Sequence, residues 1–301
     1  MKFSIITPSC NSEKYIRETI ESVIRQRGDF SIEYFVLDNL SSDRTCDIVR
    51  EYQELLVTGK MVVHCRDVQL SLITEQDSGM YDAISKGFKN ACGDIYAWIN
   101  SDDIYLPGAF DIVQRTLSKY PEISWLKGIT SYMNENSTIY EAGCCFLYRQ
   151  DWIKAGLYGT ALYFIQQDSV FWRAKLWQEG DEINKNLSLA GDYFLWKSFA
   201  KSAPLYSLNA YVSCFRKAPG QKSTDINAYW REIEEFSILT NGLSGRARRY
   251  LLERMGALPR FLRSFCYRMV FGRHEHYLVT LENGVHPCLR KGDYFALKAQ
   301  I

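Results

Sequence analysis

The sequence predicts a doubly wound α/β sandwich, in which helices cover both faces of a largely parallel β-sheet. Three observations favour this fold class. Short apolar runs rich in β-branched residues alternate with amphipathic helical patterns four times in the first hundred residues. The runs are apolar at successive positions, as in strands that are buried on both faces. Polar loops follow the runs, and ligands of this fold class bind beyond the carboxyl ends of the strands.

Each element of this first half has its own signal. The apolar runs predict strands at residues 3–7, 34–37, 61–65 and 95–99. Helices are predicted between them: one that Ser12 can cap, one around Ile48 and Val49, and one at residues 80–90. In the first of these helices, apolar side chains recur at helical spacing, at Ile16, Ile20, Val23 and Ile24.

The pattern changes after Pro107, where mixed α+β signals replace the regular alternation. The spacing of Phe110, Val113 and Leu117 predicts a helix, and another helix begins near Gly191. Short, aromatic-rich strands are expected at residues 125–130, 139–146 and 205–215.

Charge is distributed unevenly along the chain. The formal net charge is +1, yet the stretch 246–273 holds eight arginines and one acidic residue and so carries +7. The rest of the chain is therefore mildly acidic. We expect one large domain at residues 1–225, with halves at 1–103 and 104–225, followed by a basic, mainly helical region at residues 226–301.

Cysteine usage and hydropathy bear on where the protein works. Nine cysteines without a CxxC pair predict free thiols in a reducing compartment. The N-terminal apolar run is too short for a signal peptide, and no stretch approaches the roughly 20 apolar residues of a membrane span. A cytoplasmic protein is expected, either free or resting on the inner face of the cell membrane.

Two adjacent carboxylates follow the fourth predicted strand. In WINSDDIYLP the strand ends at Ile99 and delivers Asp102 and Asp103. Mg²⁺ and Mn²⁺ prefer such oxygen ligands, and an ion here would neutralise a diphosphate leaving group. By itself, the pair is also typical of a solvated turn.

A second acidic segment, TEQDSGMYDAISKG, places Asp77 and Asp82 on either side of Gly79 at the start of a helix. A helix N-terminus with a glycine nearby can receive an anion. Lys86 lies four residues after Asp82, on the same helix face. A capped surface helix with one ion pair would have the same sequence pattern.

The third segment is GDYFLW, in which Asp192 follows a glycine and precedes an aromatic, apolar helix. A carboxylate here could remove a proton from an attacking hydroxyl as a general base. In isolation, the segment favours the simpler interpretation, in which Asp192 is the N-cap of that helix.

Taken together and in this order, the segments resemble family 2 glycosyltransferases of the GT-A fold, most of all the bacterial enzymes that build polysaccharides on a lipid carrier. The family's first strand, loop and helix are similar to SIITPSCNSEKYIRETIESV, and its second strand and uracil-binding loop to FVLDNLSSDRTCDIV. The most specific stretch is TEQDSGMYDAISKGFKNACGDIYAWINSDDIYLPGAF. Later blocks of the family resemble FIQQDSVFWRAKLW, LAGDYFLWKSFAK and SCFRKAPGQKS, so the resemblance covers roughly residues 1–225.

The resemblance implies a role for each matching residue. Asp38 would accept a hydrogen bond from the nucleotide base, which the resemblance makes uracil. Asp192 would be the catalytic base, and Asp102, with Asp103 beside it, would hold Mn²⁺ or Mg²⁺. The nucleotide, the donor sugar and the acceptor would further be lined by Thr7, Pro8, Asn11, Tyr15, Asp77, Gly79, Asp82, Lys86, Asn100, Ser101, Gln166, Gln167, Arg173 and Arg216.

The implied reaction is one in-line displacement that inverts the anomeric carbon of a UDP-sugar. Asp192 would deprotonate a hydroxyl of a glycan acceptor, lipid-linked in surface polysaccharide synthesis, while metal and basic groups stabilise the departing nucleotide. The implied activity is that of a hexosyl- or N-acetylhexosaminyl-transferase.

Two positions depart from the family's pattern. Asn100 stands where many members carry the first aspartate of the metal motif, and Ala218 stands where a histidine often lies. If that histidine contacts metal or diphosphate, Arg216, Lys217 or Lys222 would supply the positive charge here.

The basic tail contains an amphipathic pattern in LPRFLRSFCYRMVF. Its apolar stripe consists of Phe261, Leu262, Phe265, Met269 and Val270, and the arginines off the stripe are Arg260, Arg263 and Arg268. The pattern is typical of a helix on an anionic membrane surface and of a helix packed on the domain with its arginines in water. No nucleic-acid-binding motif accompanies the arginines.

Three other functions would each need, or allow, different features of the sequence. A nucleotidyltransferase that makes an activated sugar would need a glycine- and arginine-rich phosphate loop after the first strand, which TPSCNSEKY lacks. A nicotinamide dehydrogenase would need GxGxxG there. A non-catalytic, membrane-associated scaffold of the same fold stays open because of Asn100 and Ala218.

Overall fold

The computed structural model describes residues 1–181, 183–221, 225–236, 247, 250–251, 253–255, 257–272 and 274–301. Lys222, a candidate source of positive charge near a diphosphate, lies outside these residues. So do four arginines of the basic stretch, namely Arg246, Arg248, Arg249 and Arg273.

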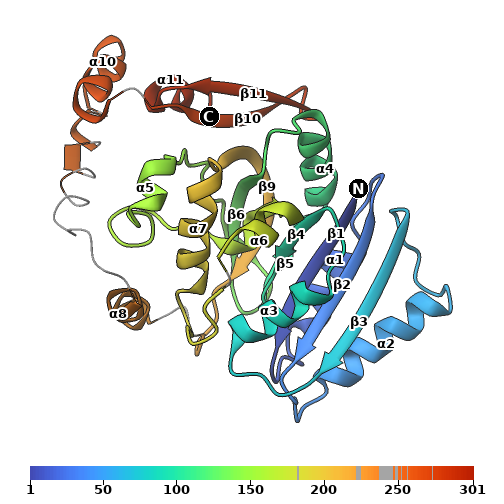
Figure 1. Ribbon diagram of the computed structural model, residues 1–301. Coiled ribbons are helices and arrows are strands. Elements are labelled where there is room, and N and C mark those ends of the chain that lie inside the picture. The colour runs from blue at the N-terminus through green and yellow to red at the C-terminus, as the bar shows by residue number, and fades with distance from the viewer. Residues whose placement is uncertain are drawn as a thin grey trace.

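In the described part of the chain, eleven strands form one mixed sheet at the centre of the molecule (Figure 1). They are β1 (Lys2–Ser9), β2 (Ser31–Asp38), β3 (Asp67–Thr74), β4 (Ile95–Trp98), β5 (Ile104–Tyr105), β6 (Trp125–Met133), β7 (Ile139–Glu141), β8 (Val170–Arg173), β9 (Tyr206–Arg216), β10 (His276–Glu282) and β11 (His286–Gly292). The main path through the sheet runs β11-β10-β9-β6-β8-β4-β1-β2-β3, with β5 paired to β9 and β7 to β6. Strands β4, β1, β2 and β3 are parallel to one another, as predicted for the first half.

Helices connect these strands and cover the sheet. They are α1 (Ile16–Ile24), α2 (Thr45–Val57), α3 (Met80–Asn90), α4 (Ala109–Lys119), α5 (Gln150–Lys154), α6 (Ala174–Glu179), α7 (Gly191–Ser202), α8 (Ile226–Phe236), α10 (Arg260–Phe271), α11 (Tyr294–Lys298) and the 3₁₀ turn η1 (Gln167–Ser169). Strands β1, β2 and β3 step in one direction across the sheet, whereas β4 lies on the other side of β1. Because βαβ crossovers are right-handed, α3 covers the face opposite to that of α1 and α2. The doubly wound arrangement is therefore confirmed, and its topological switch point lies between β1 and β4.

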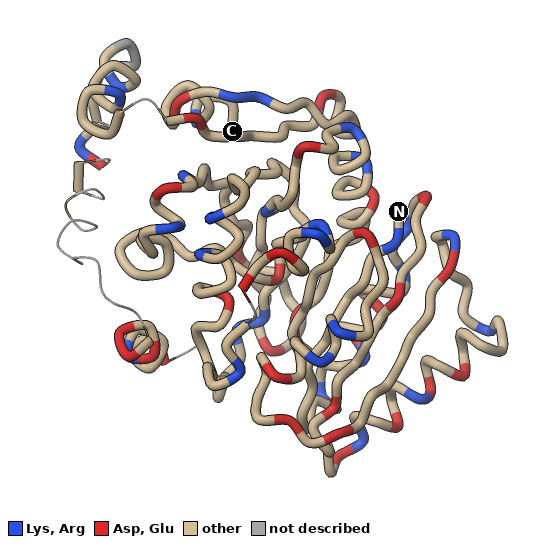
Figure 2. The backbone as a smooth tube through the Cα atoms, viewed as in Figure 1, with Lys and Arg blue, Asp and Glu red and all other residues tan. Residues whose placement is uncertain are grey.

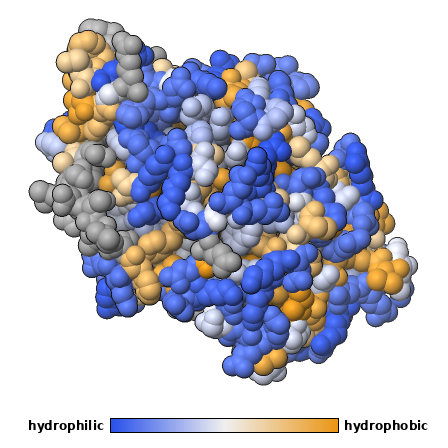
Figure 3. Space-filling view, in the orientation of Figure 1, coloured by the Kyte–Doolittle hydropathy of each residue, from blue (hydrophilic) through white to orange (hydrophobic). Residues whose placement is uncertain are grey.

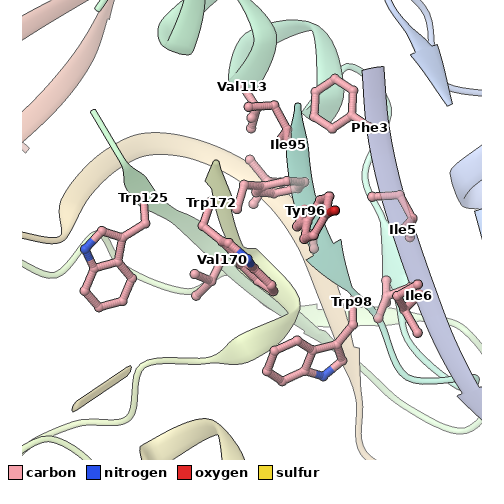
Figure 4. Close-up of a cluster of buried hydrophobic side chains, with 14 of the residues drawn as sticks. Phe3, Ile5, Ile6, Ile95, Tyr96, Trp98, Val113, Trp125, Val170 and Trp172 are labelled. Carbon is pink, nitrogen blue, oxygen red and sulfur yellow. The ribbon is translucent and has the colours of Figure 1, made fainter. Parts of the chain in front are cut away.

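An apolar core surrounds β1 and β4 (Figure 4). Phe3, Ile5 and Ile6 of β1 are fully buried, and Trp98 of β4 packs edge to face on Trp172 of β8, with ring centroids 5.6 Å apart. Burial of successive residues explains why β1 is a continuous apolar run in the sequence. The strands whose carboxyl ends carry the candidate site are thus held in a rigid core.

Two strand predictions are wrong. Residues 61–65 form no strand, and the third strand is β3, which begins two residues later. β3 is an edge strand that pairs with β2 alone along the main path, and most of its residues are exposed or half-buried. Its sequence is therefore mixed rather than continuously apolar, and for this reason the search for apolar runs did not predict this strand. Of the strand expected at 139–146, only β7 forms.

The start of α1 also differs from the prediction. The helix begins at Ile16, and no side chain caps it. Ser12 contributes through its backbone instead, because its carbonyl oxygen accepts the N–H groups of Tyr15 at 3.1 Å and Ile16 at 3.0 Å. The predicted stripe of apolar side chains along α1 is confirmed as buried.

The C-terminal region contains helices, as predicted, and a hairpin that was not predicted. β10 and β11 pair in antiparallel fashion, and β10 continues the sheet by pairing in parallel with β9. Figure 1 shows α10 beside α11 at the outer end of this hairpin, whereas α8 lies near the turn that leads into α7. The chain after residue 225 therefore packs on the preceding residues through α8, through the hairpin and through α10, whose Tyr267 accepts a hydrogen bond from Arg149.

Candidate active site

The loops after β1 and β4 meet at one edge of the sheet, where Figure 2 shows several acidic residues. The hydroxyl oxygens of Ser12 and Ser101 lie 2.8 Å apart across the switch point. The loop after β2 joins them, because the Asn11 backbone N–H donates to the Ser41 hydroxyl at 2.7 Å. The convergence of loops that the sequence predicted is thus present.

The first loop presents fewer side chains to this edge than expected. The Thr7 side chain is fully buried, with its hydroxyl 2.9 Å from that of Tyr34, and Pro8 is buried as well. Both side chains therefore belong to the core, and only their backbone could line a nucleotide, as was predicted for these residues. Asn11 is exposed at a φ of 49°, where its side-chain oxygen accepts the Ser42 N–H at 2.9 Å.

Asp38 ends β2 with its carboxylate in a tight turn. One oxygen accepts the Ser41 N–H at 2.8 Å, and the other accepts the Ser41 hydroxyl at 2.5 Å. The Cys46 thiol donates to the first of these oxygens at 3.1 Å. A nucleotide base would have to share oxygens that already accept three hydrogen bonds, which a carboxylate with four acceptor positions allows.

The turn into α3 combines a glycine and a carboxylate. Gly79 has a φ of 137°, which residues with a side chain rarely adopt, and no atom lies within 4 Å of where its β-carbon would be. The space in front of Gly79 is therefore open. Asp77 accepts the Gly79 N–H at 2.9 Å, and burial raises the pKa of Asp77 above its ordinary value.

Asp82 is an ion-paired carboxylate that joins two parts of the chain. The ammonium group of Lys86 lies 3.2 Å from one of its oxygens, and that of Lys185, in the loop before α7, lies 3.1 Å from the other. Burial would raise the pKa of Asp82, but the Ser78 N–H and the two lysines outweigh it and lower the pKa to about 2. Lys86 also pairs with Glu75 at 3.3 Å, so its charge is shared within the protein.

The two adjacent carboxylates after β4 have different surroundings. Asp103 is fully buried, and its carboxyl group accepts the Arg216 N–H at 2.8 Å and the Asn100 amide at 3.2 Å. Burial, and then the neighbouring carboxylates, raise the pKa of Asp103 well above its ordinary value. Asp102 is half-exposed and accepts the Gln221 amide at 2.7 Å. A metal ion at this edge could reach Asp102, whereas the carboxyl group of Asp103, for which a metal role was also predicted, is buried in the core.

Arg216 holds this loop instead of facing a ligand. Its side chain is fully buried, and its guanidinium donates to the Asp102 carbonyl oxygen at 2.8 Å and to Glu18 at 2.9 Å. It also donates to the Ser137 hydroxyl at 2.9 Å and lies over the ring of Tyr15, 4.0 Å from the centroid. In this structure the N–H groups of Arg216, for which a donor contact was predicted, are used inside the protein, and its guanidinium covers the ring of Tyr15.

The segment around η1 is divided between core and site edge. Gln167 keeps both amide atoms buried without a hydrogen-bond partner among the described residues, while Gln166 is half-buried. Arg173 donates to the carbonyl oxygens of Ile123 at 2.8 Å and Leu117 at 2.6 Å. Arg173, for which a contact with the donor or acceptor was predicted, is paired with the first residue of β4, at the edge of the sheet opposite to Asp102.

Asp192 lies in the first turn of α7, half-buried among aromatic side chains. One of its oxygens accepts the Tyr193 N–H at 2.8 Å and the Tyr229 hydroxyl at 3.4 Å. Burial outweighs these bonds and raises the pKa of Asp192 to about 7. A carboxyl group that titrates near neutrality can take up and release a proton during turnover.

A pocket of aromatic and apolar side chains adjoins Asp192. Its walls come from α5, the loop after it, α7 and α8, and they comprise Ile153, Tyr158, Phe164, Ile165, Tyr193, Trp196, Lys197 and Tyr229. Lys197 is half-buried there, and burial lowers its pKa. The space between these side chains is about 10 Å³, which is room for about one water molecule.

Several residues of this site escaped sequence reasoning. Asp168 is fully buried near the loop after β4, which carries Asp102 and Asp103, and it accepts the Ser213 hydroxyl at 2.5 Å. Tyr229 and Glu232 reach the start of α7 from a helix outside the recognised blocks. Gln221 stands in the block SCFRKAPGQKS, so that block contained a signal for it, whereas nothing in the local sequence around Tyr229 pointed to Asp192.

The residues at the site edge fit a divalent cation held partly by its substrate. Among the described residues there is no group of three His, Cys, Asp or Glu side chains that could hold a metal ion. Mg²⁺ and Mn²⁺ are often bound by one or two carboxylates together with substrate phosphates, and Asp102 offers one half-exposed carboxylate.

Comparison with known proteins identifies relatives with the same kind of activity. Residues 4–141 match the family described as Glycosyl transferase family 2. An uncharacterized glycosyltransferase of Rickettsia typhi is 22% identical over 79% of this chain and 70% of its own length. A dolichyl N-acetyl-alpha-D-glucosaminyl phosphate 3-beta-D-2,3-diacetamido-2,3-dideoxy-beta-D-glucuronosyltransferase of Methanococcus voltae is 24% identical over 66% of this chain and 68% of its own length.

Solved structures show the same fold. Residues 1–349 of TarS from Staphylococcus aureus, in complex with UDP-GlcNAc, match with a TM-score of 0.56 and 18% identity, over 89% of this chain and 87% of that one. A mannosyltransferase of Pyrobaculum calidifontis, in complex with GDP-Man and Mn²⁺, matches with a TM-score of 0.53 and 14% identity, over 89% and 69%. With the family match, the relatives and this fold together, the chain is a glycosyltransferase of the GT-A fold whose residues 4–141 match family 2.

Proposed function

We propose that this glycosyltransferase moves a sugar from a UDP-sugar to an acceptor hydroxyl with inversion, using Asp192 as the base. The observation that carries the proposal is the position of Asp192: a carboxyl group whose pKa is raised to about 7, beside an aromatic pocket. Its helix is joined to the turn at Gly79 through Tyr81, whose hydroxyl donates to the Leu189 carbonyl oxygen at 2.8 Å.

The proposed step transfers one proton, forms one bond and breaks one bond. The ionised carboxylate of Asp192 takes the proton of the acceptor hydroxyl, and the acceptor oxygen forms a bond to the anomeric carbon. The bond between that carbon and the diphosphate oxygen breaks, and UDP leaves with the electron pair. Attack opposite to the leaving group inverts the anomeric carbon, and no covalent intermediate on the protein is needed.

Asp102 is the residue that would hold Mn²⁺ or Mg²⁺, which would neutralise the charge that develops on the diphosphate. The Gln221 amide fixes one Asp102 oxygen at 2.7 Å, and Arg216 fixes the Asp102 backbone, so the carboxylate is oriented before a ligand arrives. The presence of Mn²⁺ with GDP-Man in the Pyrobaculum neighbour supports a divalent cation for this fold.

For the donor we propose UDP, with the base near Asp38 and the exposed Asn11 and the sugar near Asp77, Gly79 and Gln167. UDP-GlcNAc in the TarS neighbour supports this choice. The open space in front of Gly79 suits the close approach of a ligand. The buried amide of Gln167, which has no partner in the part of the chain that the structure describes, suits a hydrogen bond to a hydroxyl of the donor sugar.

For the acceptor we propose a lipid-linked glycan of bacterial surface polysaccharide synthesis, met at the membrane surface. The dolichyl phosphate-linked substrate in the name of the Methanococcus relative supports a lipid carrier. On α10, the apolar side chains of Phe265, Met269 and Val270 are 62%, 72% and 50% exposed, and Figure 3 shows apolar surface at this corner of the molecule. No helix in the described residues is long and apolar enough to span a bilayer, so contact would be peripheral.

The first experiment is a titration of purified protein with UDP, GDP and dTDP, with and without Mn²⁺, followed by a donor screen. We expect UDP to bind most tightly and to need Mn²⁺, and this binding should disappear in Asp102→Ala. With the preferred donor, UDP should be released, and Asp192→Asn should abolish release while binding remains. Release of pyrophosphate instead would indicate a nucleotidyltransferase, and binding of none of the three nucleotides would overturn the proposal.

A further inference from the structure

α8 is fixed to the loop that leads into α7. The Glu232 carboxylate accepts three consecutive backbone N–H groups, those of Ser188 at 2.5 Å, Leu189 at 2.8 Å and Ala190 at 2.6 Å. Donors at the N-terminus of a helix have no intrahelical partner, and a carboxylate there is favoured by the helix dipole as well. Glu232 therefore fixes the backbone immediately before Asp192.

Tyr229, one helical turn before Glu232, reaches Asp192 itself. Its hydroxyl donates to an Asp192 oxygen at 3.4 Å, and its ring packs edge to face on Phe164, with centroids 5.5 Å apart. Next to both, Ile233 is buried against Ala190 and the residues around it. One face of α8 thus supplies a hydrogen bond, a carboxylate clamp and apolar contact to the first turn of α7.

We propose that Tyr229 and Glu232 are positioning residues for Asp192: Glu232 holds the loop that presents the carboxylate, and Tyr229 holds one of its oxygens. Both residues lie after residue 225, outside the blocks that resemble the family. That these two residues serve catalysis rests on the proposed role of Asp192. Their contacts with the start of α7 are independent of that role.

The two residues act on the proton affinity of Asp192 in opposite directions. The Tyr229 hydrogen bond favours the ionised carboxylate, and the negative charge of Glu232 disfavours it. The other titratable groups that face Asp192 are Tyr81 from α3, Tyr158 from the loop after α5, and Tyr193 and Lys197 from α7. Removing the hydroxyl of Tyr229 should raise the pKa of Asp192, and removing the charge of Glu232 should lower it.

This opposition makes a direct test available without any substrate. The pKa of Asp192 is measured by carboxyl ¹³C NMR on full-length protein labelled at aspartate, with the signal assigned by its loss in Asp192→Asn. Tyr229→Phe should raise the pKa by about half a unit to one unit, the size expected for one hydrogen bond. Glu232→Gln should lower it, and Glu235→Gln, the same charge change on an exposed position of α8, should leave it unchanged.

Far-UV circular dichroism and thermal unfolding establish that each variant is folded, and if Glu232→Gln is not, Tyr229→Phe alone decides. An unchanged Asp192 pKa in folded Tyr229→Phe, or shifts of the same sign in both variants, would overturn the positioning role. A merely structural role for α8 would not produce shifts of opposite sign. Opposite shifts together with full transfer activity in Asp192→Asn would keep the positioning contacts and reject the base.

Discussion

The ring of Tyr81 lies directly against the backbone of Gly191, so that a β-carbon added at Gly191 would come within 2.6 Å of the ring. Tyr81 belongs to α3, which starts at the turn of Gly79. Gly191 is the first residue of α7, which carries Asp192. A glycine at this position lets the two helices approach closely. It therefore sets the distance between the turn at Gly79 and the proposed base.

Gly191→Ala should push α7 away from α3 and reduce transfer activity together with stability. Overpacking of this kind costs about 1–3 kcal/mol of unfolding free energy. Chemical denaturation and donor turnover measure the two effects. Gly292→Ala is the matched control, because the atoms nearest to its added β-carbon lie at 3.5 Å or more, and it should change stability by less than about 0.5 kcal/mol. Equal effects of both substitutions would contradict the packing argument.

The adjacent carboxylates Asp102 and Asp103 should respond differently to the same substitution. Because the pKa of Asp103 is raised in the folded protein, the folded state retains a proton that the unfolded chain releases. Stability from this group is complete below about pH 4, the ordinary aspartate range, and is lost as the pH rises toward the raised pKa. Asp103→Asn removes this loss. Because the Asn100 amide nitrogen donates to Asp103, the Asn100 amide has to turn over, and its oxygen, which lacks a partner among the described residues, then accepts a hydrogen bond from the new amide.

The measurement is thermal unfolding from pH 4 to pH 8, in which Asp103→Asn should decline less than the unsubstituted protein and keep transfer activity. Asp102→Asn is the matched contrast, and it should lower metal-dependent turnover by about 10²-fold, since it weakens stabilisation of the leaving group. A steeper decline in Asp103→Asn would indicate that its carboxyl group is ionised in the core.

Arg216→Met should loosen the loop after β4 while leaving Asp102, the proposed ligand of the metal, in place. Arg216 donates to the backbone of Asp102 and to Glu18, so its loss leaves several acceptors unpaired. At roughly 1 kcal/mol for each hydrogen bond, a total of about 2–4 kcal/mol is expected. Arg17→Met, which breaks an exposed pair with Glu51, should cost less than about 1 kcal/mol. If Arg216→Met and Arg17→Met lost similar amounts of stability and of Mn²⁺ affinity, Arg216 would not be what holds the loop of Asp102.

The sequence predicted the first half of the fold because its strands are buried on both faces. α3 occupies the predicted residues 80–90, and β1, β2 and β4 coincide with apolar runs. β3 was misplaced because an edge strand needs no continuous apolar run. The hairpin β10–β11 was missed because its residues are largely exposed or half-buried and carry polar side chains.

The sequence predicted the location of those candidate site residues whose position depends only on the loop that carries them. Asp102 and Gly79 lie at the expected edge, since strand ends and helix starts define it. Burial of a particular side chain depends on tertiary packing, and the sequence pattern does not contain it. For this reason Arg216 and Arg173, both basic residues in recognised blocks, were expected at the ligand although their guanidinium groups bind backbone carbonyl oxygens within the protein.

Transfer activity should rise with pH through about 7. Burial raises the pKa of Asp192 to about 7, and a general base works in its ionised form, so the acidic limb of kcat against pH should follow this group. Asp192→Asn should lose at least about 10²-fold at every pH. Asp181→Asn, an exposed carboxylate paired with Lys201, should leave the profile unchanged. A limb centred near pH 4 in the unsubstituted protein would show that Asp192 is not the titrating base.

Membrane contact through α10 should depend on its apolar stripe. Phe265 and Met269 are 62% and 72% exposed, whereas Tyr267 on the opposite face is fully buried, so the apolar side chains point away from the protein. The double substitution Phe265→Glu and Met269→Glu should weaken cosedimentation with vesicles that contain anionic lipid by at least about tenfold, because apolar burial and electrostatic attraction are both lost. Val57→Glu, at an 87% exposed position on α2, is the control and should bind as the unsubstituted protein does. High salt should weaken binding of the unsubstituted protein as well. If that protein does not sediment with such vesicles at low salt, the stripe serves another contact and the acceptor reaches the enzyme without it.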